Sequence, residues 1–136
     1  MGQDLAIPIH AQDMVSQTLS AISATNRDRC VRWHGAGMPW TASDWSNALA
    51  GETGELCNIV KKIRRIETGV LHSYNTPDMV TLIDKLKDEV ADVFLYLDLV
   101  AYHFGLDLES CIIRKFNMVS EAQNFPERLG HHAPTQ

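Results

Sequence analysis

The sequence lacks the features that would assign it at once to several common classes. Its three cysteines, Cys30, Cys57 and Cys111, are odd in number and widely spaced, so neither a zinc site nor a disulfide framework is predicted. No run approaches the roughly 18 consecutive apolar residues of a membrane span. The N-terminal stretch also has neither the basic start nor the long apolar run of a secretory signal. We therefore expect a protein of the reducing cytoplasm, with Cys57 and Cys111 buried as thiols.

Positive charge is also scarce. The 136 residues include 12 Lys and Arg against 17 Asp and Glu, a formal net charge of −5. This balance argues against bulk attraction to nucleic acid or to an anionic membrane. A small anionic ligand would then need local positive charge or a metal ion. The length suits a single domain spanning 1–136, with a core over about 11–128 and a mobile tail over 129–136.

Sustained strand alternation with hairpin turns is absent too, and the pattern is helical throughout. We expect helices over about 11–33, 42–67 and 77–104, and a fourth helix that runs to about 124. The expected N-caps are Thr41 or Ser43 (with Asp44 completing a capping box), Thr76 before Pro77, and Asp107, and the expected stops are Gly69 and Gly105. Short connections favour antiparallel neighbours, and therefore an all-α, four-helix bundle.

What the chain does contain is two matched pairs of carboxylates. Glu52 and Glu55 lie in Gly-Glu-Thr-Gly-Glu-Leu, and Glu89 and Asp92 lie in Glu-Val-Ala-Asp-Val. The i, i+3 spacing puts both members of a pair on one face of a helix. At about 100° per residue, Glu52 and Glu89 share the apolar sector of their helices, and Glu55 and Asp92 border it. These sectors contain Trp45, Leu49, Leu56, Ile59 and Ile63 on the second helix and Leu82, Leu86, Val93, Tyr96 and Val100 on the third.

Acids in an apolar seam are costly unless positive charge meets them. A hard divalent cation bound through oxygen is the simplest occupant for two such pairs, and it points to phosphate chemistry. Two other interpretations compete. The acids could form a solvated edge of two amphipathic helices, or a buried salt-bridge network, for which these helices offer few basic residues. Trp45, which lies on the apolar stripe, is interpreted as packing.

Two lysines have a place in this pattern. Lys62 lies two turns after Glu55 on the same side of its helix. Lys115 falls within the apolar stripe of the fourth helix, so its amine either meets a phosphate or an acid or extends to water. The other cations of the run from Lys61 to Arg65 fit a solvated helix end. The third helix is apolar nearly all round after Asp92, which predicts a subunit interface.

Taken together, these residues resemble the MazG-like nucleoside triphosphate pyrophosphohydrolases of the all-α NTP pyrophosphatase superfamily, which includes the dCTP pyrophosphatases and the dimeric dUTPases. The resemblance covers about 29–128. It rests on Leu-Ala-Gly-Glu-Thr-Gly-Glu-Leu over 49–56, Glu-Val-Ala-Asp-Val-Phe-Leu-Tyr over 89–96, Lys-Phe-Asn over 115–117, and Phe-Pro over 125–126. The stretch over 68–76 is longer than the family pattern, so the resemblance leaves base preference open.

The resemblance implies hydrolysis of a nucleoside triphosphate between the α and β phosphates, with a role in house-cleaning of the nucleotide pool. It implies Mg²⁺, with Mn²⁺ as a substitute, and a homodimer or homotetramer. The metal ligands would be Glu52, Glu55, Glu89 and Asp92. By the same resemblance, Lys115 and Asn117 match positions that contact phosphate or sugar, Tyr96 matches a position near the nucleotide, and Trp33 matches an aromatic that packs on the base.

In such an enzyme, Glu52 or Glu55 would orient or deprotonate the attacking water. The metal would neutralise and position the triphosphate, and Lys62 or Lys115 would help to hold the charge of the leaving pyrophosphate. The number of metal ions stays open. A di-iron carboxylate bundle is a second enzyme class, but it needs Glu-x-x-His on two helices, and neither acid pair contains histidine. A non-enzymatic helical interaction module would explain the apolar third helix but not the inward acids.

Overall fold

The structure, a computed structural model, describes residues 18–35, 37, 39–70 and 77–130. In this part of the chain it contains four helices and no strand: α1 (Leu19–His34), α2 (Ala42–Glu67), α3 (Met79–His103) and α4 (Leu108–Ala122). The predicted all-α chain is thus confirmed for the described residues. The predicted start of the first helix near residue 11 was wrong, because Thr18 is extended and caps α1: its hydroxyl accepts a hydrogen bond from the Ala21 amide at 3.2 Å. The longer stretch over 71–76 and the tail from 131 lie outside the described residues.

Local sequence signals set most helix ends. The hydroxyl of Thr41 accepts a hydrogen bond from the Asp44 amide (3.3 Å), and the Asp44 carboxylate accepts one from the Thr41 amide (2.7 Å). This is the predicted capping box, and α2 has the predicted bounds. Gly69 and Gly105 follow α2 and α3 with φ values of 68° and 65°, a conformation that suits glycine. The carboxylate of Asp107 caps α4, as predicted.

The predicted start of α3 was wrong. The N-cap is Asp78, whose carboxylate accepts a hydrogen bond from the Thr81 amide at 2.8 Å, and not Thr76, which lies outside the described residues. Aspartate caps a helix at least as well as threonine. Pro77 consequently precedes the cap and does not lie in the first turn.

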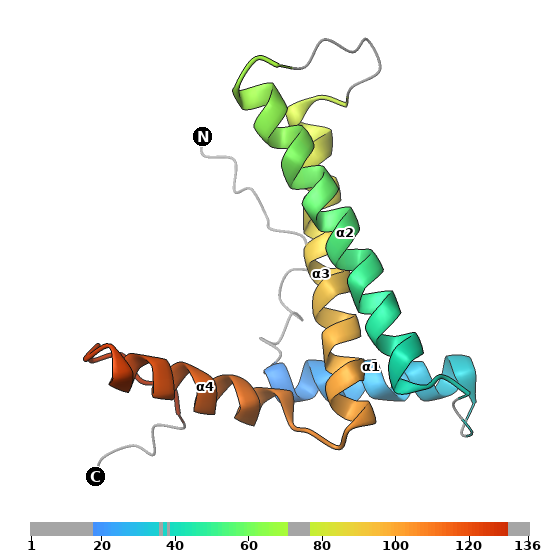
Figure 1. Ribbon diagram of the computed structural model, residues 1–136. Coiled ribbons are helices and arrows are strands. Elements are labelled where there is room, and N and C mark those ends of the chain that lie inside the picture. The colour runs from blue at the N-terminus through green and yellow to red at the C-terminus, as the bar shows by residue number, and fades with distance from the viewer. Residues whose placement is uncertain (1–17, 36, 38, 71–76, 131–136) are drawn as a thin grey trace, which may run out of the picture.

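The dominant packing contact joins α2 and α3, which run antiparallel as a long hairpin (Figure 1). Ile59 of α2 and Leu82 of α3 are buried in it, with 6% and 0% of their surface exposed. The helix α1 crosses the hairpin at the end away from the α2–α3 turn, where Cys30 packs with Trp45 and Leu99. The seam follows the apolar sectors that the sequence predicts.

The fourth helix diverges from the hairpin. It contacts α1 and α3 near its first turns and extends away from α2, whose backbone it does not approach (Figure 1). The Ser20 hydroxyl donates a hydrogen bond to the Glu109 carboxylate, which connects α1 to α4. Within one chain, therefore, the four helices do not pack side by side as the predicted bundle.

Two further expectations fail on burial. Cys57 is exposed and Cys111 is half-buried, so Cys30 is the buried thiol among the three. Cys57 follows Leu56 by one residue, which rotates it by about 100° and carries it off the core stripe. The run after Asp92 in α3, which is apolar nearly all round, also contains a fully buried charge, Asp98, which faces α1.

None of the described helices combines the length and the apolar content needed to cross a membrane.

Truncating Leu82 tests the importance of the α2–α3 seam. Because this side chain is fully buried, Leu82→Ala should lower the free energy of unfolding by about 2–5 kcal/mol. Lys85→Ala, at an exposed position of the same helix, should change it by less than about 0.5 kcal/mol. Chemical denaturation followed by circular dichroism measures both, and equal effects would contradict this account of the seam.

Candidate functional site

Three of the four acids that are predicted as metal ligands converge at the α2–α3 seam. One carboxylate oxygen each from Glu52, Glu55 and Glu89 lies within 4.8 Å of the other two. The antiparallel packing explains this geometry, because it sets the Glu52–Glu55 face of α2 opposite the Glu89 turn of α3. Asp92 lies outside this trio, but it lines the same pocket as Glu52.

The acids occupy the edge of the seam and not its dry interior. Glu52, Glu89 and Asp92 are half-buried, and Glu55 is exposed. Across the described ranges, none of the four accepts a hydrogen bond or forms an ion pair, and the three ion pairs found there involve other acids. The interpretation as a buried salt-bridge network is therefore excluded for this part of the chain.

Mutual repulsion marks this cluster. Burial raises the pKa of Glu52, and the negative charges of Asp92, Glu55 and Glu89 raise it further. The pKa of Glu89 is raised by burial and then by the charges of Glu55, Asp92 and Asp88. Crowded carboxylates of this kind favour a bound proton or a bound cation. Because oxygen is the only donor atom, the cluster suits a hard cation such as Mg²⁺ or Mn²⁺.

A pocket of about 310 Å³ opens beside the acids, at the junction of α1, α2 and α3. It has an acidic edge, an aromatic wall and a polar patch contributed by α1. Its lining residues are Asn26, Arg29, Cys30, Trp33 and His34 from α1, Trp45 and Glu52 from α2, and Asp92, Leu95, Tyr96 and Leu99 from α3. Its size is in the range of small-molecule sites.

The aromatic wall is built around Trp45. The centroid of this ring lies 4.5 Å from that of Trp40, 5.8 Å from that of His34 and 6.4 Å from that of Tyr96. Trp45 is 1% exposed, which confirms its prediction as a packing residue. Its indole nitrogen is buried without a hydrogen-bond partner among the described residues. Trp45 therefore supports the core and also faces the pocket.

Trp33 lies at the rim. Its ring stacks on His34 with the centroids 6.3 Å apart, and 79% of the residue is exposed. An indole exposed to this degree offers a free face to a planar ligand. Trp33 and Tyr96, both predicted to lie near a nucleotide, line the same pocket as the acids Glu52 and Asp92.

The polar side of the pocket was missed from the sequence. Asn26 and Arg29 line it, and Asn26 is only 4% exposed. The sequence did contain a pattern that indicates this position. Asn26, Cys30 and Trp33 are spaced i, i+4 and i+7, which places them on one helical face. Polar residues on such a face are easily mistaken for a solvated edge.

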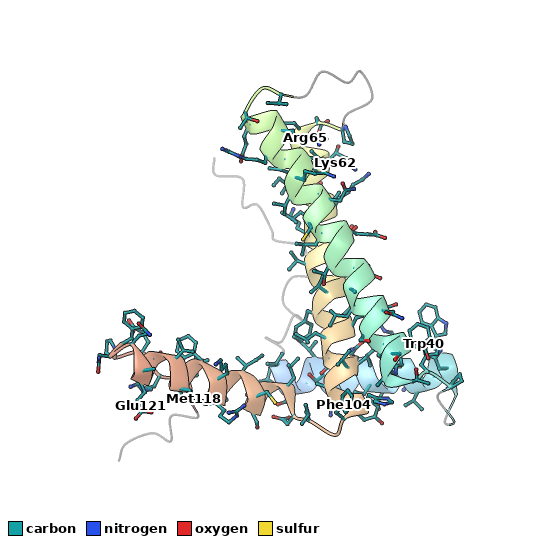
Figure 2. The ribbon with its side chains drawn as sticks, viewed as in Figure 1. Trp40, Lys62, Arg65, Phe104, Met118 and Glu121 are labelled. Carbon is teal, nitrogen blue, oxygen red and sulfur yellow. The ribbon has the colours of Figure 1, made fainter. Side chains whose placement is uncertain are left out.

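The predicted lysines and Asn117 are not part of this pocket. Lys62 is half-buried on α2, and Figure 2 shows it with Arg65 toward the far end of the hairpin from Trp40. Lys115 is exposed on α4 and lines a separate hollow with Phe116. The Asn117 side chain uses both of its polar atoms on the backbone of Leu129, at 2.7 Å each.

The arrangement can therefore bind a hard cation and an anionic ligand with a planar ring within one pocket. The acids supply oxygen ligands, Trp33 supplies an exposed stacking face, and Arg29 supplies positive charge. No family model matches the chain, and neither does any curated protein or any solved structure.

Proposed function

We propose that this protein is a Mg²⁺-dependent nucleoside triphosphate pyrophosphohydrolase of the MazG-like type. It would cleave a (d)NTP to the (d)NMP and pyrophosphate, and so remove excess or non-standard nucleotides from the pool. The observation that carries the proposal is the convergence of three carboxylates within 4.8 Å of one another beside an aromatic-lined pocket. Either feature alone would be common on a helical protein.

The donor set fits the proposed metal. Glu52, Glu55 and Glu89 would hold Mg²⁺, with Asp92 beside them as the fourth predicted ligand. When bound, the ion would neutralise the polyphosphate charge and act as a Lewis acid. The raised pKa of Glu52 and Glu89 supports this assignment, because none of the ion pairs in the described part of the chain involves these acids.

The chain's own residues divide the remaining work. Glu55 is exposed, so it or Glu52 can hold an attacking water by accepting its proton. Trp33 and Tyr96 line this pocket and would contact the nucleoside, and a base stacked on Trp33 would cover its exposed face. The aromatic contact accepts any planar base, so it supports nucleotide binding without selecting one base.

Replacing one cluster acid tests the enzymatic proposal. Glu55→Gln keeps the size of the side chain but removes its charge and its basicity, so Mg²⁺-dependent pyrophosphate release should fall at least about 100-fold. Glu67→Gln, at an exposed acid of the same helix, is the matched control and should stay active. Release is measured on a panel of the common and damaged (d)NTPs, with circular dichroism as a check on the helical fold. An active Glu55→Gln protein, or a wild type inactive on the whole panel, would defeat the proposal.

The cluster should also make stability depend on pH. The pKa of Glu89 in the folded chain exceeds its ordinary value of 4.5, so the folded state binds the proton more tightly than the unfolded state. Stability is therefore lost as the pH rises above about 4.5. Without metal, Glu89→Gln should unfold at higher denaturant concentration than the wild type at pH 7, and this advantage should vanish at pH 4.

Two controls sharpen this comparison. Glu121→Gln, at an exposed acid on α4 (Figure 2), should leave the denaturation midpoint unchanged at both pH values. Adding Mg²⁺ at pH 7 should raise the midpoint of the wild type more than that of Glu89→Gln, because a ligand stabilises the state that binds it. A wild type that matches Glu89→Gln at pH 7 would contradict the proposed repulsion.

We further propose that the active form is a homodimer or homotetramer. One side of α3, next to its seam with α2, exposes Ile83, Val90 and Leu97 to between 40% and 53%, at spacings of seven residues that fall on one helical side. Exposed apolar stripes of this kind mark association surfaces. A second copy would cover this stripe, and it would also be the source of the Lys115 that the single chain keeps away from its own acids.

A charge on this stripe tests the assembly. Leu97→Glu should shift the protein toward the monomer mass in size-exclusion chromatography with light scattering, because a carboxylate in an apolar interface is poorly solvated. Lys85→Glu, at an exposed position of the same helix, should leave the mass unchanged. A wild-type protein that is monomeric at all concentrations would contradict the proposed oligomer.

A helical interaction module is the alternative that the same stripe favours. It differs from the enzyme in its ligand requirement. Stabilisation by Mg²⁺ together with a nucleotide supports the enzyme, whereas association with a partner that ignores both metal and nucleotide supports the module.

A further inference from the structure

The most deeply buried charge of the described chain belongs to Asp98, which lies where α3 meets α1. It is 0% exposed, and its Oδ2 accepts a hydrogen bond from the Asn26 amide at 2.9 Å. Its other oxygen lies 3.8 Å from an Nη atom of Arg27, whose guanidinium covers the Tyr102 ring at 5.1 Å. This Oδ1 has no hydrogen-bond partner among the described residues, so the Asn26 hydrogen bond and the Arg27 charge together offset the desolvation of the carboxylate.

Asn26 connects the buried Asp98 to a third residue, Arg29, through its hydrogen bonds. Its Nδ2 donates to both Asp98 Oδ2 and the Leu95 carbonyl oxygen (3.0 Å), so both amide protons are used. The two acceptors fix the plane of the amide and turn Oδ1 the other way, where it accepts a hydrogen bond from Nη2 of Arg29 at 3.1 Å. Asn26 thus has little capacity left to read a ligand, but it is well placed to hold Arg29.

Arg29 is the one cationic side chain, with histidine counted as neutral, among the described residues that line the pocket beside the acids. It shares that pocket with Glu52 and Asp92, yet the ion pairs of the described residues do not include it. One of its five N–H groups is used on Asn26, which leaves the other donors of the guanidinium for a ligand.

We propose that Arg29 binds a phosphate group of the ligand in this pocket, and that Asn26 and Asp98 are positioning residues that hold its guanidinium there. The inference rests on the proposed function, because it takes the ligand to be a nucleoside polyphosphate. A planar guanidinium fork matches two phosphate oxygens. Arg29 at one end and a cation on the acids at the other would together offset the negative charge of a polyphosphate held between them.

The binding role is tested with Arg29→Ala and Arg29→Lys. The matched control is Arg32→Ala, which removes the same charge from an exposed position of α1 outside the pocket. Dissociation constants are measured by calorimetry for Mg²⁺ with inorganic tripolyphosphate and with each (d)NTP of the panel. Arg29→Ala should weaken binding about 10- to 100-fold, the range expected for losing a charge-assisted contact. Arg29→Lys should fall between Arg29→Ala and the wild type, and Arg32→Ala should match the wild type.

The outcomes separate the two proposals. A wild type that binds these ligands while Arg29→Ala binds them equally well would overturn the role of Arg29 and leave the proposed function intact. A wild type that binds none of them would overturn the proposed function and this inference together. For the hydrolysed (d)NTP, the loss should appear mainly as a higher KM and less as a lower kcat.

The positioning role is tested with a double-mutant cycle. Asn26→Ala should raise the KM in the wild-type background and change it little in the Arg29→Ala background, because residues that act through one another are non-additive. Asp98→Asn, which keeps an oxygen to accept from Asn26, should raise the KM less than Asp98→Ala does. Circular dichroism checks that each variant is folded. If an alanine variant does not fold, Asp98→Asn still allows the test, because it keeps an oxygen that accepts the hydrogen bond from Asn26. Additive effects of Asn26→Ala and Arg29→Ala, or equal KM values for Asp98→Asn and Asp98→Ala, would overturn the positioning role.

Discussion

The packing of α2 against α3 is the contact on which the rest of the structure depends. The apolar stripe that includes Ile59 and Leu82 closes the hairpin, and Glu52, Glu55 and Glu89 lie at the edge of the same seam. Burying the stripe therefore partly desolvates these acids and brings like charges together, and the pKa of Glu52 and of Glu89 is raised by burial first and by the neighbouring charges second. The free energy gained by burying the apolar stripe offsets the unfavourable electrostatic free energy of the crowded acids at its edge. The cation of the proposed function would lower this cost.

The helix α1 is attached to this hairpin by both apolar and polar contacts, and the polar ones determine its register. Cys30 packs against Trp45 and Leu99, a contact that tolerates small shifts because dispersion has little directionality. The hydrogen bonds from Asn26 to Asp98 and to the Leu95 carbonyl do not tolerate them. A shift of α1 along α3 would leave the buried Asp98 without its donor, at a cost of several kcal/mol. Fixing Asn26 in this way also fixes the part of α1 that supplies the rim of the pocket.

Sequence reasoning succeeds here where the signal is local and fails where it depends on how helices cross. The capping box of Thr41 and Asp44 involves atoms three residues apart, so the start of α2 was predictable. The helical period placed Glu52 on the side of the partner helix, but it could not set the depth of the acids, because depth depends on the spacing of α2 and α3. The pairing of Asn26 with Asp98 joins residues 72 positions apart, and a polar residue on α1 carries no mark of its distant partner. The departure of α4 from the hairpin has the same origin, because a short loop limits distance but not direction.

The shape of the chain connects the acid cluster to the question of assembly. One side of α3 packs on α2 and another meets α1, while a third side exposes Val90 and Leu97. The diverging α4 in turn exposes apolar residues such as Phe116 and carries Lys115 away from the acids of its own chain. A second copy packed on α3 would bury apolar surface that one chain leaves in water, and it would surround the acid edge with additional groups. Under the proposed function, the apolar third helix and the paired acids, which begin as separate features of the sequence, would serve one purpose: association would complete a site whose acids form no ion pair among the described residues of their own chain.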